Sequence, residues 1–176
     1  TSDNEIIRNP RWLIQSEEKL KKLQHSHSRK KKGSNNREKT RLKLAKLYEK
    51  VSNQRRYFQN VLSTRLINEN QVIVLEHLKS SNMVKNHKLA KSISDVSWYE
   101  FTRQLEYKGM WNGRDVIKID QFFPSSQLCS NCGEINKQTK DLNYRTYECG
   151  KCGLVIDRDY NASLNILNEG LKILKN

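Results

Sequence analysis

The N-terminal part of the chain has apolar residues at helical spacing. Asn9 and Pro10 favour a helix start, because asparagine caps helix ends and proline suits the first helical position. We expect this helix to reach about His27, and a second, longer helix to run from about Arg37 to Glu69. The apolar positions of the second helix, which step by three, four or seven residues, are Leu44, Tyr48, Val51, Phe58, Leu62 and Leu66.

The stretch SRKKKGSNNREK, residues 28–39, interrupts this periodicity with a glycine, two serines and two asparagines. Such a cluster predicts a turn. Together with the helices around it, the turn predicts a helical hairpin at about 9–69 with a basic tip. We interpret its apolar stripe as a packing surface.

The pattern changes after the hairpin. QVIVLEHL (71–78) contains a continuous β-branched run, which predicts a strand buried on both faces of a mixed or parallel sheet. DVIKID (115–120) predicts another strand, and a capping-box pattern at 97–100 predicts a helix between the two. A helix is also expected after Asp159, broken or loosened at Gly170. Strands between long helices indicate an α/β or α+β domain.

Positive charge is concentrated in one segment. The net charge of the chain is +14, and residues 8–56 contain 17 Lys/Arg against 4 Asp/Glu. A balanced domain with a basic arm favours a nucleic-acid partner, although a solvated helix surface remains the alternative. The candidate phosphate contacts at the hairpin tip are Arg29, Lys30, Lys31, Lys32 and Arg37. Contacts of this kind position a nucleic acid without selecting its sequence.

No apolar run of eighteen residues occurs, so no membrane span is predicted. The stretch TSDNEIIRNPRW lacks an apolar signal core, so secretion is not expected. Trp98 and Trp111 could stack on bases, but core packing is the more ordinary role for tryptophan.

Four cysteines form two pairs of the type Cys-x-x-Cys, with Cys129 and Cys132 in the first and Cys149 and Cys152 in the second. Each pair suits a tight knuckle, and two knuckles present four thiolates to one zinc ion. Gly133 and Gly153 follow the pairs where such a turn needs a left-handed residue. A closed four-sulfur site has no open position for water, so we expect structural zinc.

Two acidic residues are candidates for catalysis. Glu76 ends the first predicted strand, and ligands of open α/β sheets gather at the carboxyl ends of strands. Asp159 stands at a predicted helix start, where capping explains a carboxylate about as well as catalysis does. Carboxylates from separated elements can hold magnesium or manganese for phosphodiester cleavage. From the residues alone, the chain is either a metal-dependent nuclease or a nucleic-acid binder.

Several segments resemble the TnpB/OrfB proteins of insertion sequences. CSNCG and YECGKCGLVIDRDYNASLNIL are similar to that family's C-terminal zinc ribbon and last catalytic motif, and VIVLEHL is similar to its central motif. The stretches LAKSISDVSWYEFTRQLEYK and FFPSSQLCSNCG resemble its connecting segments. The segment from Asn9 to Ser63 resembles its helical insertion, so the resemblance covers nearly the whole chain.

This resemblance implies an α/β fold of the RNase H-like (RuvC-type) class, N-terminally truncated, with a long helical-hairpin insertion and a four-cysteine zinc ribbon. It implies RNA-guided cleavage of DNA by a magnesium- or manganese-dependent enzyme, with DNA and guide RNA as partners. It also implies a cytoplasmic, nucleoid-associated protein encoded by a prokaryote or a mobile element. Glu76 matches the second of the family's three metal-binding acids, and Asp159 matches the third. Asp157 is then a neighbour, and Arg158 a phosphate contact.

The chain departs from the family at its start, because the family's first catalytic Asp lies upstream of the position that matches Thr1. We therefore expect the C-terminal portion of a longer protein, in which metal binding is weakened. The expected domains are a partial nuclease core at 1–128, a zinc ribbon at 129–153 and a return to the core at 154–176. The alternative is a zinc-ribbon module that binds nucleic acid without cutting it.

Overall fold

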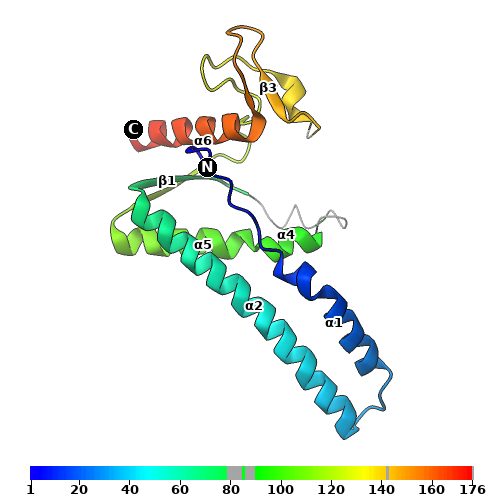
Figure 1. Cartoon of the computed structure of the whole chain (residues 1–176). Coiled ribbons are helices and arrows are strands. Elements are labelled where there is room, and N and C mark those ends of the chain that lie inside the picture. Colours follow the sequence, from blue (N-terminus) through cyan, green and yellow to red (C-terminus); the bar gives the residue numbers. More distant parts are fainter. Residues whose placement is uncertain (79–84, 86–89, 142, 176) are drawn as a thin grey trace. The chain divides into compact units, whose positions relative to one another are not determined.

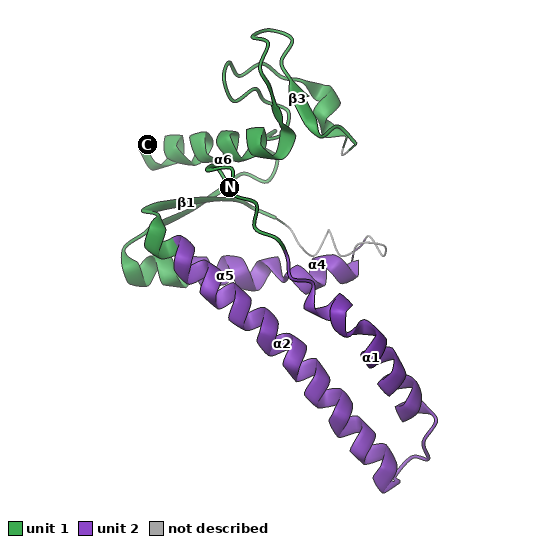
Figure 2. Cartoon of the chain, viewed as in Figure 1, with its two compact units in different colours: residues 1–8, 67–79, 106–176 green, residues 9–66, 80–105 purple. Residues whose placement is uncertain are grey.

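The computed structural model describes residues 1–78, 85, 90–141 and 143–175, and this part of the chain is mixed α/β and mostly helical (Figure 1). Contacts divide the chain into two compact units. Unit 1 comprises residues 1–8, 67–79 and 106–176, and unit 2 comprises residues 9–66 and 80–105 (Figure 2). The domain boundaries expected from the sequence stay predictions.

Unit 2 contains helices α1 (Trp12–Ser28) and α4 (Ala90–Val96) and most of helices α2 (Asn35–Glu69) and α5 (Trp98–Asn112). The two long helices expected from the apolar periodicity are therefore present. Leu20 of α1 and Leu47 and Val51 of α2 are buried. Of the six apolar positions predicted on the second helix, Val51 is buried and Tyr48 is 46% exposed, so the stripe supplies packing only in part.

The start of α1 differs from the prediction. The helix begins at Trp12, after Arg11 in a left-handed conformation with φ 56°. The Asn9 side chain accepts a hydrogen bond from the Arg11 amide at 3.0 Å, so it closes a turn before the helix rather than capping its end. The predicted cap at Asn9 is therefore wrong by two positions.

Helices α2, α4 and α5 are joined by buried polar contacts. The Gln59 amide group donates to the carbonyl of Val96 at 2.8 Å, and the Ser63 hydroxyl donates to Gln104 at 3.0 Å. The predicted capping box at 97–100 is not formed: Ser97 has a φ of 54°, whereas a capping serine is extended. The Glu100 carboxylate instead accepts hydrogen bonds from Arg103 and Gln104, one turn further along α5.

Unit 1 contains the parallel strands β1 (Val72–Glu76) and β2 (Asp115–Ile119), with Glu76 opposite Ile119. Both predicted strands are present, and their parallel pairing agrees with the mixed or parallel sheet expected for the first of them. All five residues of β1 are only partly buried, so the prediction of a strand buried on both faces is wrong for this structure.

Helix α6 (Arg158–Lys175) runs through Gly170 without a break, which corrects the predicted loosening. Gly170 is buried, and a Cβ atom built there would lie 2.4 Å from both methyl carbons of Val74 on β1. The glycine is therefore explained by close contact between helix and strand.

The remainder of unit 1 is a small module with strands β3 (Thr146–Glu148) and β4 (Val155–Asp157) and the 3₁₀ helix η1 (Lys137–Lys140). β3 and β4 pair antiparallel around the second cysteine pair.

Elsewhere in unit 1, Trp111 is 75% exposed and makes an edge contact with Tyr107, with ring centroids 4.7 Å apart. The expectation that Trp111 packs in a core is therefore wrong.

Within the described ranges, no helix has both the length and the apolar character needed to cross a membrane.

Candidate metal centre and acidic site

The two cysteine knuckles repeat one backbone pattern. In the first, the Cys129 amide donates to the Glu134 carbonyl at 2.8 Å, and the Gly133 amide donates to the Cys129 carbonyl at 2.9 Å. In the second, the corresponding bonds join Cys149 with Leu154 at 2.8 Å and Gly153 with Cys149 at 3.0 Å. Gly133 and Gly153 have φ values of 74° and 73°, so the prediction of left-handed glycines is confirmed.

The four thiols converge on one point. Their sulfur atoms all lie within 4.8 Å of one another, with Cys129–Cys152 and Cys132–Cys149 each separated by 3.6 Å. A tetrahedral zinc with bonds of about 2.3 Å places its sulfur ligands about 3.8 Å apart. The donor set and its spacing therefore fit zinc, and the cluster is consistent with a structural zinc site.

The pKa values of Cys152 and Cys132 are shifted in opposite directions. Hydrogen bonds from the Asn131 side chain and the Leu154 amide lower the pKa of Cys152 to about 6. A hydrogen bond from Glu134 acts to lower the pKa of Cys132, but desolvation and the neighbouring cysteines together raise it to about 12. Four thiolates so close together are stable only beside a cation, which is the chemistry that a zinc ion supplies.

Tyr147 forms the centre of the module around the cysteines. Its side chain is fully buried against Cys129 and Cys149, with Leu154 and Ile156 packed on the same cluster. Its hydroxyl donates to the carbonyls of Gln127 and Glu134, and burial raises its pKa to about 12. The sequence predicted that residues 154–156 lead back to the nuclease core, but Leu154 and Ile156 still pack within the cysteine module.

Two asparagines of α6 fasten the loop that leads into the first knuckle. The Asn161 side chain accepts from the Ser130 amide at 3.0 Å and donates to the Leu128 carbonyl at 2.6 Å. One turn later, the Asn165 side chain donates to the carbonyls of Ser125 and Leu128. Both asparagines are buried, so these bonds form in a place where water does not compete for them.

The same loop reaches the first candidate acid. Glu76 is the last residue of β1, and its carboxylate accepts a hydrogen bond from the Ser125 hydroxyl at 2.6 Å. Ser125 is buried, and its carbonyl is the one that Asn165 holds. A hydrogen-bonded path therefore connects Glu76 with α6 through a single serine.

The second candidate acid, Asp159, lies in the first turn of α6 but does not cap the helix. The Asp157 carboxylate accepts the amide hydrogens of Asp159 and Tyr160, each at 2.9 Å, so Asp157 provides the cap. The Asp159 side chain is 70% exposed and accepts a hydrogen bond from Arg158 at 2.9 Å. Arg158 is itself buried, and its guanidinium also reaches the Asp141 carbonyl.

Glu76 and Asp159 both belong to unit 1, but they do not form a recognisable cluster by themselves. Among the described residues, one group of three or more His, Cys, Asp or Glu side chains can hold a metal, and it is the four cysteines. Asp3 lies in a turn near the N-terminus, where the Asn4 amide donates to the Thr1 carbonyl. The roles of Glu76, Asp159 and Arg158 stay predictions.

The basic residues at the hairpin tip are of two kinds: some form contacts within the turn, and others are exposed. Lys30 contacts the Thr40 hydroxyl with its ammonium group, and Arg37 donates to the Lys30 carbonyl at 2.9 Å, so these two residues shape the turn. Arg29, Lys31 and Lys32 are exposed. The predicted phosphate contacts stay predictions, with these three side chains the more accessible.

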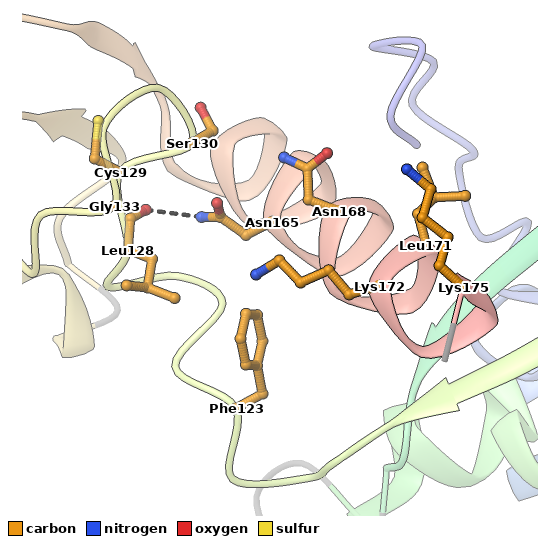
Figure 3. Close-up of a pocket in the computed structure, with 10 residues that line it drawn as sticks. All are labelled: Phe123, Leu128, Cys129, Ser130, Gly133, Asn165, Asn168, Leu171, Lys172 and Lys175. Carbon is orange, nitrogen blue, oxygen red and sulfur yellow. Dashed lines mark hydrogen bonds between the residues drawn. The ribbon is translucent and has the colours of Figure 1, made fainter.

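A hollow of about 450 Å³ lies beside the first knuckle (Figure 3). It is lined by the knuckle and its approach at Phe123 and Leu128, and by the face of α6 that carries Asn165, Asn168 and Lys172. The Lys172 ammonium is paired with Glu169 at 3.1 Å. The Asn165 side chain, which donates to the Leu128 carbonyl, is one of the lining groups.

Sequence reasoning missed Ser125, Asn161 and Asn165, which position the loop and Glu76. The sequence feature that could have indicated the two asparagines is their spacing of four residues in a helix with an apolar face. That spacing puts both amides on one side of α6, but it does not reveal which carbonyls they bind.

Comparison with known proteins finds two family models on this chain. Residues 1–87 match a family described as "Probable transposase" (OrfB of the IS605 type), and residues 98–166 match "Cas12f1-like, TNB domain". The second match contains all four cysteines and both Asp157 and Asp159.

Three relatives illustrate the range of similarity. A protein of Streptomyces pristinaespiralis named "Putative RNA-guided DNA endonuclease" is 46% identical over 97% of this chain and 42% of its own length. InsQ of Escherichia coli K12, of the same description, is 32% identical over 98% of this chain and 46% of its own length. TnpB-like protein L79 of Acanthamoeba polyphaga mimivirus is 34% identical over 73% of this chain. The chain thus spans less than half the length of these relatives.

Among solved structures, the fold is similar to a chain in a cryo-electron microscopy structure of a Cas12f1–sgRNA–target DNA complex. The TM-score is 0.60 at 20% identity, and the match covers 94% of this chain and 45% of the other. At this identity the match supports the fold alone.

Proposed function

Because this chain belongs to the TnpB/OrfB family of the IS605 type and carries a Cas12f1-like TNB domain, we propose that it contributes to an RNA-guided, metal-dependent DNA endonuclease. The proposal includes an RNase H-like (RuvC-type) core, a long hairpin insertion and a structural zinc bound by the four cysteines. The observation that carries it is the placement of Glu76 at the carboxyl end of a parallel strand, joined through Ser125 to helix α6, whose first turn contains Asp159.

In this proposal Glu76 and Asp159 are ligands of magnesium or manganese. Their carboxylates are the donor type that these ions prefer. When bound, the metal polarises the scissile phosphate and activates water for an in-line displacement.

The residues around the two acids supply orientation. The Ser125 hydroxyl fixes one carboxylate oxygen of Glu76, and the buried Arg158 restrains the Asp159 carboxylate. Asp157 caps α6 and leaves the Asp159 side chain free of that task. Ser125 lies in the loop before the first knuckle. The zinc module holds this loop through the Thr139 hydroxyl, which donates to the Ser126 carbonyl, and Asn165 of α6 donates to the carbonyl of Ser125. The zinc therefore has a positioning role in this proposal and takes no part in the reaction.

The test is a chimaera in which the matching segment of the Streptomyces relative is replaced by residues 1–176 of this chain. We expect guide-dependent DNA cleavage in magnesium to fall at least about a hundredfold with Glu76→Gln or Asp159→Asn, because each removes a metal ligand. Asp157→Asn is the matched control, since it makes the same chemical change two residues away and keeps a capping oxygen. If the Glu76 and Asp159 variants cut DNA as fast as the parent, these residues are not ligands of the catalytic metal.

A second function is favoured by the charge of the hairpin. Residues 8–56 have 17 basic against 4 acidic residues, which suits a module that holds nucleic acid without cutting it. If the chimaera folds and binds DNA and guide RNA but does not cut, this second function replaces the first.

A further inference from the structure

The exposed surface of α2 carries a row of four lysines, Lys39, Lys43, Lys46 and Lys50, which we call the lysine row. Their spacing is four, three and four residues. With about 100° of rotation per residue, the four side chains leave the helix within about 60° of one another. At about 1.5 Å per residue, the row extends along about 16 Å of the helix.

The row lies on solvent-facing helix surface. All four lysines are exposed, whereas Thr40, Leu47 and Val51 of the same stretch are buried. These buried positions are rotated from the centre of the row by about a quarter turn. The lysines are therefore not needed to pack the hairpin.

Four basic residues of the hairpin outside the row form ion pairs. Arg41 pairs with Glu38, Arg55 with Asp95, and Lys21 and Lys22 with Glu17 and Glu18. Across the part of the chain that the structure describes, none of the four row lysines forms an ion pair. The two acids adjacent to the row in sequence, Glu38 and Glu49, leave the helix about a quarter turn or more away from the centre of the row, and Glu38 is paired with Arg41.

The row continues into uncharged donors. Asn53 and Tyr57 follow Lys50 on the same side of α2, and Tyr57 is 72% exposed. Asparagine and tyrosine side chains, like lysine, are common donors to phosphate oxygens. A line of unpaired ammonium groups extended by neutral donors suits a regularly charged polymer. A membrane-surface helix would instead need a broad apolar face beside its charges, and on this side of α2 lysines occupy those positions.

We propose that the lysine row binds the sugar–phosphate backbone of RNA or DNA, as a surface distinct from the hairpin tip. The inference rests on the proposed nucleic-acid function of the hairpin but is independent of cleavage. It adds four residues to those that the sequence singled out, and it predicts contact without base selectivity.

The test compares two variants of the 176-residue chain with equal loss of charge. The row variant changes Lys39, Lys43, Lys46 and Lys50 to Gln. The control variant changes Lys19, Lys21, Lys22 and Arg41 to Gln, four basic positions of the same hairpin outside the row. Glutamine has a helix propensity close to that of lysine, so both variants should keep the helical circular dichroism of the parent.

Binding is measured by fluorescence anisotropy without divalent metal, over a series of salt concentrations. The probes are duplex DNA, duplex RNA and an RNA–DNA hybrid. We expect the row variant to bind at least about tenfold more weakly, and the slope of log affinity against log salt to flatten by up to about 4, since each phosphate contact contributes about one. The control should change the slope by less than half as much. Comparison of the probes identifies whether RNA or DNA is the preferred backbone.

Equal losses in both variants would overturn the inference, because the row would then act only through net charge. So would an unchanged row variant, or a row-dependent affinity for phosphatidylserine vesicles that exceeds the affinity for nucleic acid. A third variant, with Arg29, Lys31 and Lys32 changed to Gln, separates the two proposals. If binding falls for this tip variant alone, the proposed function of the hairpin stands and the row is excluded.

Discussion

The carboxylate of Asp157 accepts a hydrogen bond from the backbone amide of Asp159 at 2.9 Å, and another from the amide of Tyr160. The two aspartates therefore have different tasks, although they are two residues apart at the same helix end. Asp157 satisfies amides that the first turn of a helix leaves unpaired. The Asp159 carboxylate faces solvent and Arg158, where it is available to a ligand.

Removal of the Asp157 carboxylate should destabilise the chain through α6. We expect Asp157→Ala to lower the free energy of unfolding by about 1 kcal/mol, since two first-turn amides lose their acceptor. Urea denaturation followed by circular dichroism measures the change. Asp157→Asn keeps a capping oxygen and should stay close to the parent. A loss for the asparagine variant as large as that for alanine would show that the cap is not the reason.

Removal of zinc should loosen the cysteine module selectively. We expect the chain to bind one zinc ion per molecule and Cys149→Ser to abolish that binding, as measured by native mass spectrometry. Addition of a chelator should accelerate hydrogen exchange in peptides from 128–157, because metal binding and folding are coupled in small modules of this kind. Peptides from α2 provide the internal control, and Ser130→Ala should retain the metal. Unchanged exchange after complete metal removal would argue against a stabilising role.

The knuckles were predictable because their geometry is local. Two cysteines three positions apart and a glycine after the second largely determine a turn, and both turns have the expected left-handed glycines. The long helices were predictable from apolar spacing for the same reason. The exact starts of α1 and α5 were not predictable, because at Arg11 and at Ser97 the chain enters the helix through a left-handed residue that no preference for capping residues foretells.

The supports of the acidic site depend on contacts between distant segments, and these the sequence does not display. Asn165 meets Ser125 across 40 residues of chain, and Ser125 meets Glu76 across 49. Each partner is an ordinary polar residue whose role exists only after folding. The capping aspartate was misassigned by two residues, because both Asp157 and Asp159 satisfy the same local preference and only the position of the helix start distinguishes them.

Acid should weaken the contact between α1 and α4. A hydrogen bond with Lys91, and then one with Lys21, lowers the pKa of Glu17 from 4.5 to about 2. Because the folded pKa is depressed, the stabilisation is present above pH 4.5 and is lost as the pH falls towards about 2. The thermal midpoints of the parent and of Glu17→Gln should differ slightly at neutral pH and converge through this window. Glu18→Gln, whose partner Lys22 lies in the same helix, is the control. A constant difference down to the acid limit would contradict the assignment.

Addition of one methyl group at Gly170 should destabilise unit 1. Alanine is the better helix former by about 1 kcal/mol, but its Cβ would lie 2.4 Å from both methyl carbons of Val74. Because overpacking of this kind costs about 1–3 kcal/mol, we expect Gly170→Ala to lower the free energy of unfolding in urea. Gly150→Ala is the control, since nothing lies within 4 Å of a Cβ built there.

A double variant tests whether the lower free energy of unfolding of Gly170→Ala comes from contact with Val74 or from a change in helix propensity. Val74→Ala removes the two methyl groups that a Cβ at Gly170 would meet, so Gly170→Ala should cost less in its presence than alone. Contacting residues commonly show coupling of about 0.5–3 kcal/mol, and that is the size expected here. Strictly additive effects would contradict direct contact, and a more stable Gly170→Ala variant would contradict the close approach of α6 to β1.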